Sequence, residues 1–139
     1  MNIRALFIED EGWGVTPYFP ELEKHGFECR LVRNGNEAFR ELNGKTYDLV
    51  VMDMMFEPGH SLGENVSFNE AGLKLLQKIR NGEIPKCSPD IIVVVLTAIF
   101  NSKTEKQIKA LGVKAYLKKP MEFSKVIDSF IQAVQQVRD

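Results

Sequence analysis

The chain has 139 residues, of which 44% are hydrophobic and 27% are charged, and its formal net charge is −1. This length predicts a single domain spanning 1–139, and this composition excludes a disordered tail, a collagen-like fibre and a coiled coil. A net charge so close to zero gives no overall basic field of the kind that attracts nucleic acid or a membrane surface.

Neither the cysteines nor the apolar runs indicate secretion or a membrane span. Cys29 and Cys87 are far apart and lack a metal-type spacing, which predicts two reduced thiols rather than a disulfide framework. No apolar run reaches the ~18 residues that a membrane helix needs. The first apolar run is followed at once by Glu9, Asp10 and Glu11, unlike a secretory signal. We therefore expect a cytoplasmic protein.

The chain begins with a predicted strand and an interrupted helix. The continuous apolar run 5–8 is typical of a strand buried on both faces. Pro17 and Pro20 fall where the next helix should begin, and proline is tolerated only in the first turn of a helix. We therefore expect an irregular stretch around 12–14 and then a short helix over 20–25.

The next elements are a weak strand at 29–32, a helix and a second buried strand. Asn34 precedes the helical pattern and Glu37 stands three positions later, which is a variant of the capping box. The helix extends to about residue 42. The run 49–52 is again continuous and apolar, as expected for a strand of a parallel sheet.

A third helix, with apolar residues at helical spacing over 72–79, ends before Gly82. It is followed by the longest apolar run, 91–96, which predicts a strand. Ser102 and Glu105 have the spacing of a capping box, so we expect a helix that begins there and closes at Gly112.

The last two elements are a weak strand at 114–117 and an amphipathic helix from Phe123 to Val137. Alternating strands and helices predict an α/β protein with a parallel sheet and helices on both faces. Of the two common doubly wound topologies, five strands fit the order 2-1-3-4-5. The site in such sheets lies beyond the carboxyl ends of the strands.

Polar residues follow four of the predicted strands. They are two adjacent acids after the first strand, an acid after the third, a hydroxyl after the fourth and a lysine after the fifth: Glu9, Asp10, Asp53, Thr97 and Lys119. Adjacent carboxylates repel unless a cation lies among them, and oxygen ligands suit Mg²⁺. A carboxylate, a hydroxyl, a lysine and Mg²⁺ together indicate phosphoryl transfer.

This set resembles the receiver domain of two-component response regulators over nearly the whole chain. The matching segments are 6–11, 50–53, 95–98 and 116–120, in that order and each at a strand end. The resemblance implies a flavodoxin-like fold, as in chemotaxis regulators. It implies that Asp53 is the phospho-acceptor, that Asp10 binds Mg²⁺ directly and Glu9 through water, and that the Met55 carbonyl is a further metal ligand.

The resemblance also assigns residues that bind the phosphoryl group or change conformation with it. Thr97, followed by Ala98, matches the hydroxyl that bonds the phosphoryl group, and Tyr116 matches the aromatic residue that switches on activation. Lys119 matches the family's lysine, and its bond to Pro120 is expected to be cis.

The implied function is a phospho-receiver; the short stretch after the last helix favours a stand-alone protein, and a receiver that belongs to a longer protein stays open. A sensor histidine kinase or histidine phosphotransfer protein would phosphorylate it, and it would signal to an unidentified output protein through the surface of its fourth helix, fifth strand and fifth helix. We expect no enzyme activity beyond its own Mg²⁺-dependent phosphorylation and dephosphorylation, no direct DNA binding, no membrane binding, and a monomer or weak dimer.

Two other functions remain open. One is a degenerate receiver-like interaction module without phosphotransfer, against which the intact acids, hydroxyl and lysine argue. The other is a flavodoxin-type cofactor binder, which would need a phosphate-cradling loop where the chain instead has three acids, 9–11.

Three local features depart from an ordinary receiver or add to it. The segment 57–68 lengthens the connection after Asp53; we expect a partly ordered flap over the site that changes kinase docking, or else a mobile excursion with no role. We expect Trp13 and Phe19 to pack rather than to shield the site. Between Lys103 and Lys119 there are six lysines and one acid, either a solvated face or the docking site of an acidic partner.

Overall fold

The computed structural model describes residues 2–98 and 101–135. Five parallel strands form one sheet in the order β2-β1-β3-β4-β5, which confirms the predicted fold class and topology. The strands are β1 Ile3–Ile8, β2 Phe27–Val32, β3 Leu49–Met52, β4 Ile92–Thr97 and β5 Ala115–Lys118.

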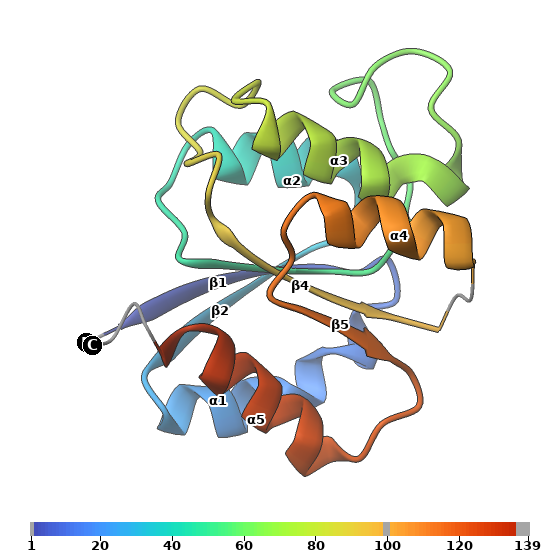
Figure 1. The fold of residues 1–139 in the computed structure, drawn as a ribbon. Helices are drawn as coiled ribbons and strands as arrows, with labels where there is room; N and C mark the ends of the chain where they lie inside the picture. Colours follow the sequence, from blue (N-terminus) through green and yellow to red (C-terminus); the bar gives the residue numbers. More distant parts are fainter. Residues whose placement is uncertain (1, 99–100, 136–139) are drawn as a thin grey trace.

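Helices cover both faces of the sheet (Figure 1). One face carries α2 Gly35–Leu42, α3 Ala71–Arg80 and α4 Ser102–Ala110, and the other carries α1 Phe19–Lys24 and α5 Phe123–Ala133. In the part of the chain that the structure describes, no helix is long and apolar enough to cross a membrane.

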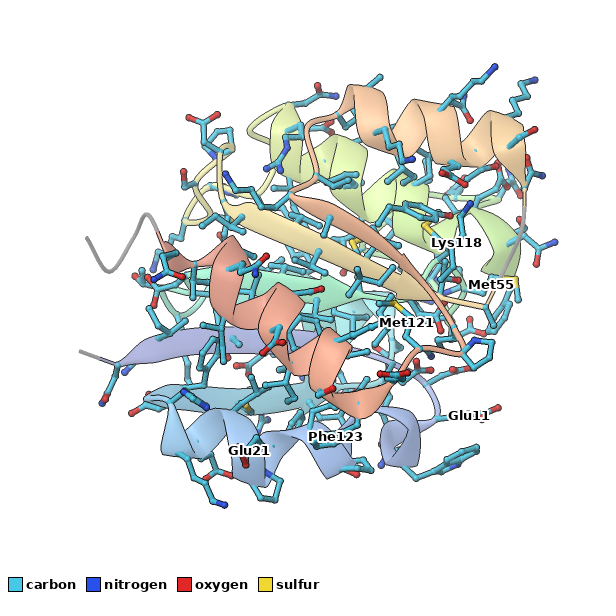
Figure 2. All side chains as sticks on the ribbon, turned by 60° about the horizontal axis from the view of Figure 1, so that its bottom comes forward. Glu11, Glu21, Met55, Lys118, Met121 and Phe123 are labelled. Carbon is cyan, nitrogen blue, oxygen red and sulfur yellow. The ribbon has the colours of Figure 1, made fainter. Side chains whose placement is uncertain are left out.

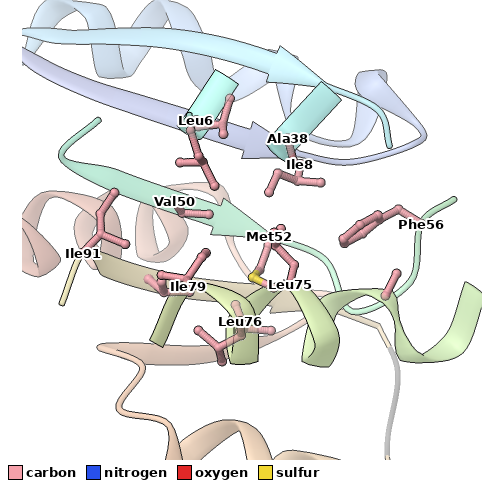
Figure 3. Close-up of a cluster of buried hydrophobic side chains, with 14 of the residues drawn as sticks. Leu6, Ile8, Ala38, Val50, Met52, Phe56, Leu75, Leu76, Ile79 and Ile91 are labelled. Atoms are coloured by element: carbon pink, nitrogen blue, oxygen red, sulfur yellow. The ribbon is translucent and has the colours of Figure 1, made fainter. Parts of the chain in front are cut away.

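The sheet separates two hydrophobic cores because successive strand residues point to opposite faces. Leu6 and Ile8 of β1 pack towards α2 and α3, together with Val50 and Met52 of β3 (Figure 3). Phe7 points the other way and contacts the second core. Burial on both faces explains why the β1 and β3 sequences are continuous apolar runs.

The expected interruption after β1 is confirmed. Two 3-10 turns, Gly12–Gly14 and Thr16–Tyr18, precede α1, and Pro20 lies in the first turn of that helix. Proline is tolerated there because the first helical N–H groups have no partner within the helix.

The predicted cap of α4 is wrong by one residue. Asn101 is the N-cap, since its side chain accepts a hydrogen bond from the Thr104 amide at 3.1 Å, and Ser102 is already helical. The helix closes before Gly112 as predicted, with φ of 79° at that glycine. The last part of the predicted C-terminal helix, up to Val137, lies outside the described residues, and α5 ends at Ala133.

The first half of the segment 57–68 packs against α2. The Glu57 carbonyl accepts a hydrogen bond from the Gly35 amide at 2.8 Å, and Asn36 Oδ1 accepts one from the Ser61 amide at 2.8 Å. Leu62 is buried in the core beneath α2. Buried Leu62 and these hydrogen bonds fix residues 57–62 to the first turn of α2, so this half of the segment is neither a flap over the site nor a mobile excursion.

Candidate functional site

The strand register brings the predicted acids to one edge of the sheet. Ile8 pairs with Met52, so Glu9 and Asp53 follow at adjacent positions, and the Asp53 amide donates to the Ile8 carbonyl at 3.1 Å. Thr97 of β4 pairs with Lys118 of β5. Residues at the end of β4 and directly after β1, β3 and β5 thus meet at the same edge.

Asp53 is held with its two carboxylate oxygens in different surroundings. Oδ1 accepts hydrogen bonds from the Met54 amide at 2.6 Å and from the Thr97 hydroxyl at 2.8 Å. Oδ2 lies 3.5 Å from Lys119 Nζ. The Asp53 side chain is 15% exposed, so the carboxylate is fixed but remains reachable from solvent.

Lys119 joins the two acids that the register brings together. Its Nζ lies 3.1 Å from Glu9 Oε2, and Glu9 is only 4% exposed. Burial, followed by the charge of Asp53, raises the pKa of Glu9 to about 7, although Lys119 opposes the shift. Burial would lower the pKa of Lys119, but the charges of Glu9 and Asp53 outweigh it and raise that pKa.

Two carboxylates, Glu9 and Asp53, share one lysine, and after burial the charge of Asp53 is the next cause of the raised Glu9 pKa. Across residues 2–98 and 101–135, no three His, Cys, Asp or Glu side chains form a cluster with metal-binding geometry. Mg²⁺ does not need one, because it takes one or two carboxylates and keeps several waters. Asp10 follows Glu9 and Asp53 follows Met52 on the neighbouring strand, so the two aspartates that the sequence predicts as metal ligands come from adjacent strand ends.

Two further cavities border the site. Tyr116 is half-buried and lines a cavity of about 340 Å³ with Met55 and Thr104, together with Met54, Asn69, Glu70 and Asn101. The other, about 420 Å³, opens beside Glu9 and Lys119. Figure 2 shows Met55 and Met121 at this edge of the molecule.

The predicted site residues therefore fall into two groups. Glu9, Asp53, Thr97 and Lys119 interact directly, and the Lys119–Pro120 bond is cis as expected. The remaining residues neighbour these four. Asp10 is half-buried, and its carbonyl accepts a hydrogen bond from Arg33 Nη1 at 3.2 Å. Met55 follows two residues after Asp53, exposed Ala98 follows Thr97 directly, and Tyr116 lies on β5.

Two residues that line the cavity beside Tyr116, Asn69 and Glu70, were not predicted from the sequence. Asn69 and Glu70 come from a capping box at Ser67, whose Ser-x-x-Glu spacing could have revealed it. Trp13 lines the second cavity and is 74% exposed, so the expectation that it packs is wrong, whereas Phe19 does pack on Phe7 with ring centroids 4.8 Å apart.

A comparison with family models matches residues 6–131 to the response regulator receiver domain. The chain belongs to this family. Receiver domains act in two-component signal transduction, take phosphoryl groups from histidine kinases and bind a divalent metal at the phosphorylation site.

Curated relatives are distant. The chain is 29% identical over 124 residues to the regulatory protein VanRB of Enterococcus faecalis, covering 88% of this chain and 48% of that protein. It is 24% identical over 131 residues to hybrid signal transduction histidine kinase B of Dictyostelium discoideum, and the match covers 93% of this chain and 6% of that protein. The chain thus spans about half or less of the length of these relatives.

Solved structures share the fold. A response regulator from Thermotoga maritima has a TM-score of 0.71 at 20% identity, covering 97% of this chain and 99% of that one. A response regulator protein from Burkholderia pseudomallei, with a phosphorylated aspartic acid, calcium ion and citrate, has a TM-score of 0.67 at 20% identity. The match covers 99% of this chain and 71% of that one.

Proposed function

We propose that Asp53 accepts a phosphoryl group from a phosphohistidine of a sensor kinase or phosphotransfer protein, with Mg²⁺ as cofactor. The observation that carries the proposal is the direct contact of Asp53 with both Thr97 and Lys119. Membership of the receiver family and the phosphorylated aspartic acid of the Burkholderia relative support it.

The contacts of Asp53 assign a task to each neighbour. A carboxylate oxygen of Asp53 attacks phosphorus, so that a P–O bond forms while the P–N bond of the phosphohistidine breaks. The imidazole leaves with the electrons of that bond and takes a proton from solvent. The ammonium group of Lys119, 3.5 Å from Oδ2, balances negative charge on the phosphoryl oxygens.

Mg²⁺ would be held by Asp10, Asp53 and the Met55 carbonyl, with Glu9 acting through water. When bound, this ion neutralises phosphoryl charge and lowers the repulsion between the acids. The Thr97 hydroxyl, which now donates to Asp53 Oδ1, can donate to the phosphoryl group instead. This exchange would move Thr97 and Tyr116 and so alter the surface of α4, β5 and α5.

The cellular setting follows from the same proposal. We propose a cytoplasmic receiver, monomeric or weakly dimeric, that signals to an output protein without itself contacting DNA. Its chemistry would be limited to its own phosphorylation and dephosphorylation.

The test is phosphorylation by acetyl phosphate with Mg²⁺, measured by intact-protein mass spectrometry. The parent should gain one phosphoryl group, Asp53→Asn should gain none, and Asp90→Asn, an exposed acid away from the site, should label like the parent. An unlabelled parent would favour the degenerate interaction module, and a labelled Asp53→Asn variant would show that another residue is the acceptor.

A further inference from the structure

The strand β2 forms one edge of the sheet and carries backbone groups that face away from its neighbour. In the part of the chain that the structure describes, it pairs with β1 and with no other strand (Figure 3). The Val32 carbonyl turns to β1, where it accepts a hydrogen bond from the Glu9 amide at 3.0 Å. Because backbone direction alternates along a strand, the backbone groups of Cys29 and Leu31 face outward. Such an edge is a template for a further strand.

The side of β2 that faces α2 is hollowed along this edge. Glu28 and Arg30 are exposed, and they line a cavity of about 310 Å³ together with Arg4. Cys29 lines the same cavity although its side chain packs against the core on the opposite face of the sheet. The cavity therefore reaches the outer edge of the strand, where a second strand can approach.

The two exposed charges of β2 have opposite signs and can be engaged from outside. The Glu28 side chain is 54% exposed, and its Oε2 lies 3.3 Å from Arg4 Nε. The Arg30 side chain is 59% exposed, and its Nη2 lies 3.9 Å from Glu41 Oε2, which is longer than a hydrogen bond. The Arg30 guanidinium can therefore turn towards another carboxylate.

These positions make β2 complementary to an antiparallel copy of itself. A two-fold axis at Cys29 sets Glu28 of each copy opposite Arg30 of the other, in the type of pair that brings side chains closest. Cys29 then meets its own copy through its outward backbone groups. The same register sets Phe27 opposite Leu31, an apolar pair on the other face of the sheet. An axis at residue 28 or 30 would instead place like charges opposite each other, so charge selects the register.

The other outer strand does not offer this complementarity. The strand β5 ends with Lys118, and Lys114 directly precedes it. Lysines on an edge strand are a common protection against pairing with a copy. The opposite charges of β2, two residues apart, have the reverse effect.

We propose that the outer edge of β2 pairs with β2 of a second copy of this chain, antiparallel about Cys29, so that the two sheets join into one. Such an interface is isologous, and every contact occurs twice. Strands of the two copies run in opposite directions, so their acceptor edges lie at opposite ends of the joined sheet. Association should therefore leave the labelling of Asp53 by acetyl phosphate unchanged.

The test is charge reversal, followed by sedimentation velocity at increasing protein concentration. The parent should form a concentration-dependent dimer. Glu28→Arg or Arg30→Glu alone should weaken the dimer at least about tenfold, because each turns two attractive pairs into repulsive ones. The swap Glu28→Arg/Arg30→Glu should return it to within about threefold of the parent. The controls Glu64→Arg and Arg40→Glu change exposed positions elsewhere and should associate like the parent.

A mixture of the two single variants gives a second readout that a folding defect would not imitate. Glu28→Arg has two arginines on the strand and Arg30→Glu has two glutamates, so together they should form a mixed dimer although neither dimerises alone. Three results would overturn the proposal: a parent that stays monomeric up to about 1 mM, equal loss of association in the control variants, or no dimer in both the swap and the mixture.

Discussion

Lys119 Nζ lies 3.1 Å from Glu9 Oε2 and 3.5 Å from Asp53 Oδ2, so a single ammonium group connects two acids from different strands. The lysine follows β5, whereas the acids follow β1 and β3. Its position makes the protonation of Glu9, the charge of Asp53 and the binding of a cation interdependent.

The first prediction concerns pH. The pKa of Glu9 rises from 4.5 to about 7 on folding, so between these values the folded state binds more protons than the unfolded state. Stability must therefore fall as pH rises through this window, by up to about 3 kcal/mol from this group. Chemical unfolding in chelator at pH 5 and pH 8 should show a smaller fall for Glu9→Gln than for the parent. An equal fall in stability in both proteins would contradict a buried Glu9 with a raised pKa.

The second prediction concerns the metal. An ion that binds only the folded state raises the melting temperature by mass action. Mg²⁺ should stabilise the parent, and Asp10→Ala should remove most of the increase because it removes the proposed direct ligand. Asp90→Ala, which changes an exposed acid elsewhere, should respond like the parent. A thermal melt without any Mg²⁺ response in the parent would count against the proposed cation site.

The third prediction concerns the lifetime of the phosphorylated state. Met55 lies two residues beyond Asp53 and lines the neighbouring cavity with an apolar side chain, which cannot orient an attacking water. Met55→Asn should therefore speed phosphate loss, by about tenfold. The decay of phosphorylated protein after removal of acetyl phosphate measures the rate. Ile99, two residues beyond Thr97 in the sequence, is also apolar and lies outside the described residues.

The fourth prediction concerns the segment 57–68. A Cβ at Gly35 would collide with the carbonyl oxygen of Pro58, so Gly35→Ala should destabilise the fold by about 1–3 kcal/mol. Asn36→Ala, which removes the acceptor of the Ser61 amide, should cost about 1 kcal/mol. Labelling of Asp53 should stay within about twofold in both variants, under about 0.4 kcal/mol in barrier, because the segment packs on α2. Faster labelling of Asp53 in either variant would instead support a flap that covers the site.

Several features of this protein follow from short-range sequence signals. The apolar runs at 5–8 and 49–52 predict buried parallel strands because only such strands bury both faces. The order of strands and helices then places the residues after each strand at one edge, which is why Asp53, Thr97 and Lys119 were predicted to meet. Pro20 predicted the late start of α1 because proline is confined to the first turn.

The tertiary structure decided what depends on distant contacts. Whether 57–68 covers the acceptor or packs on α2 depends on the fit of Pro58 against Gly35, two positions far apart in the chain. The near-neutral pKa of Glu9 comes from burial and from Asp53, neither of which the local sequence shows. Local patterns determine strands, helices and strand ends through periodicity, whereas burial, charge balance and loop direction arise only when separate elements pack together.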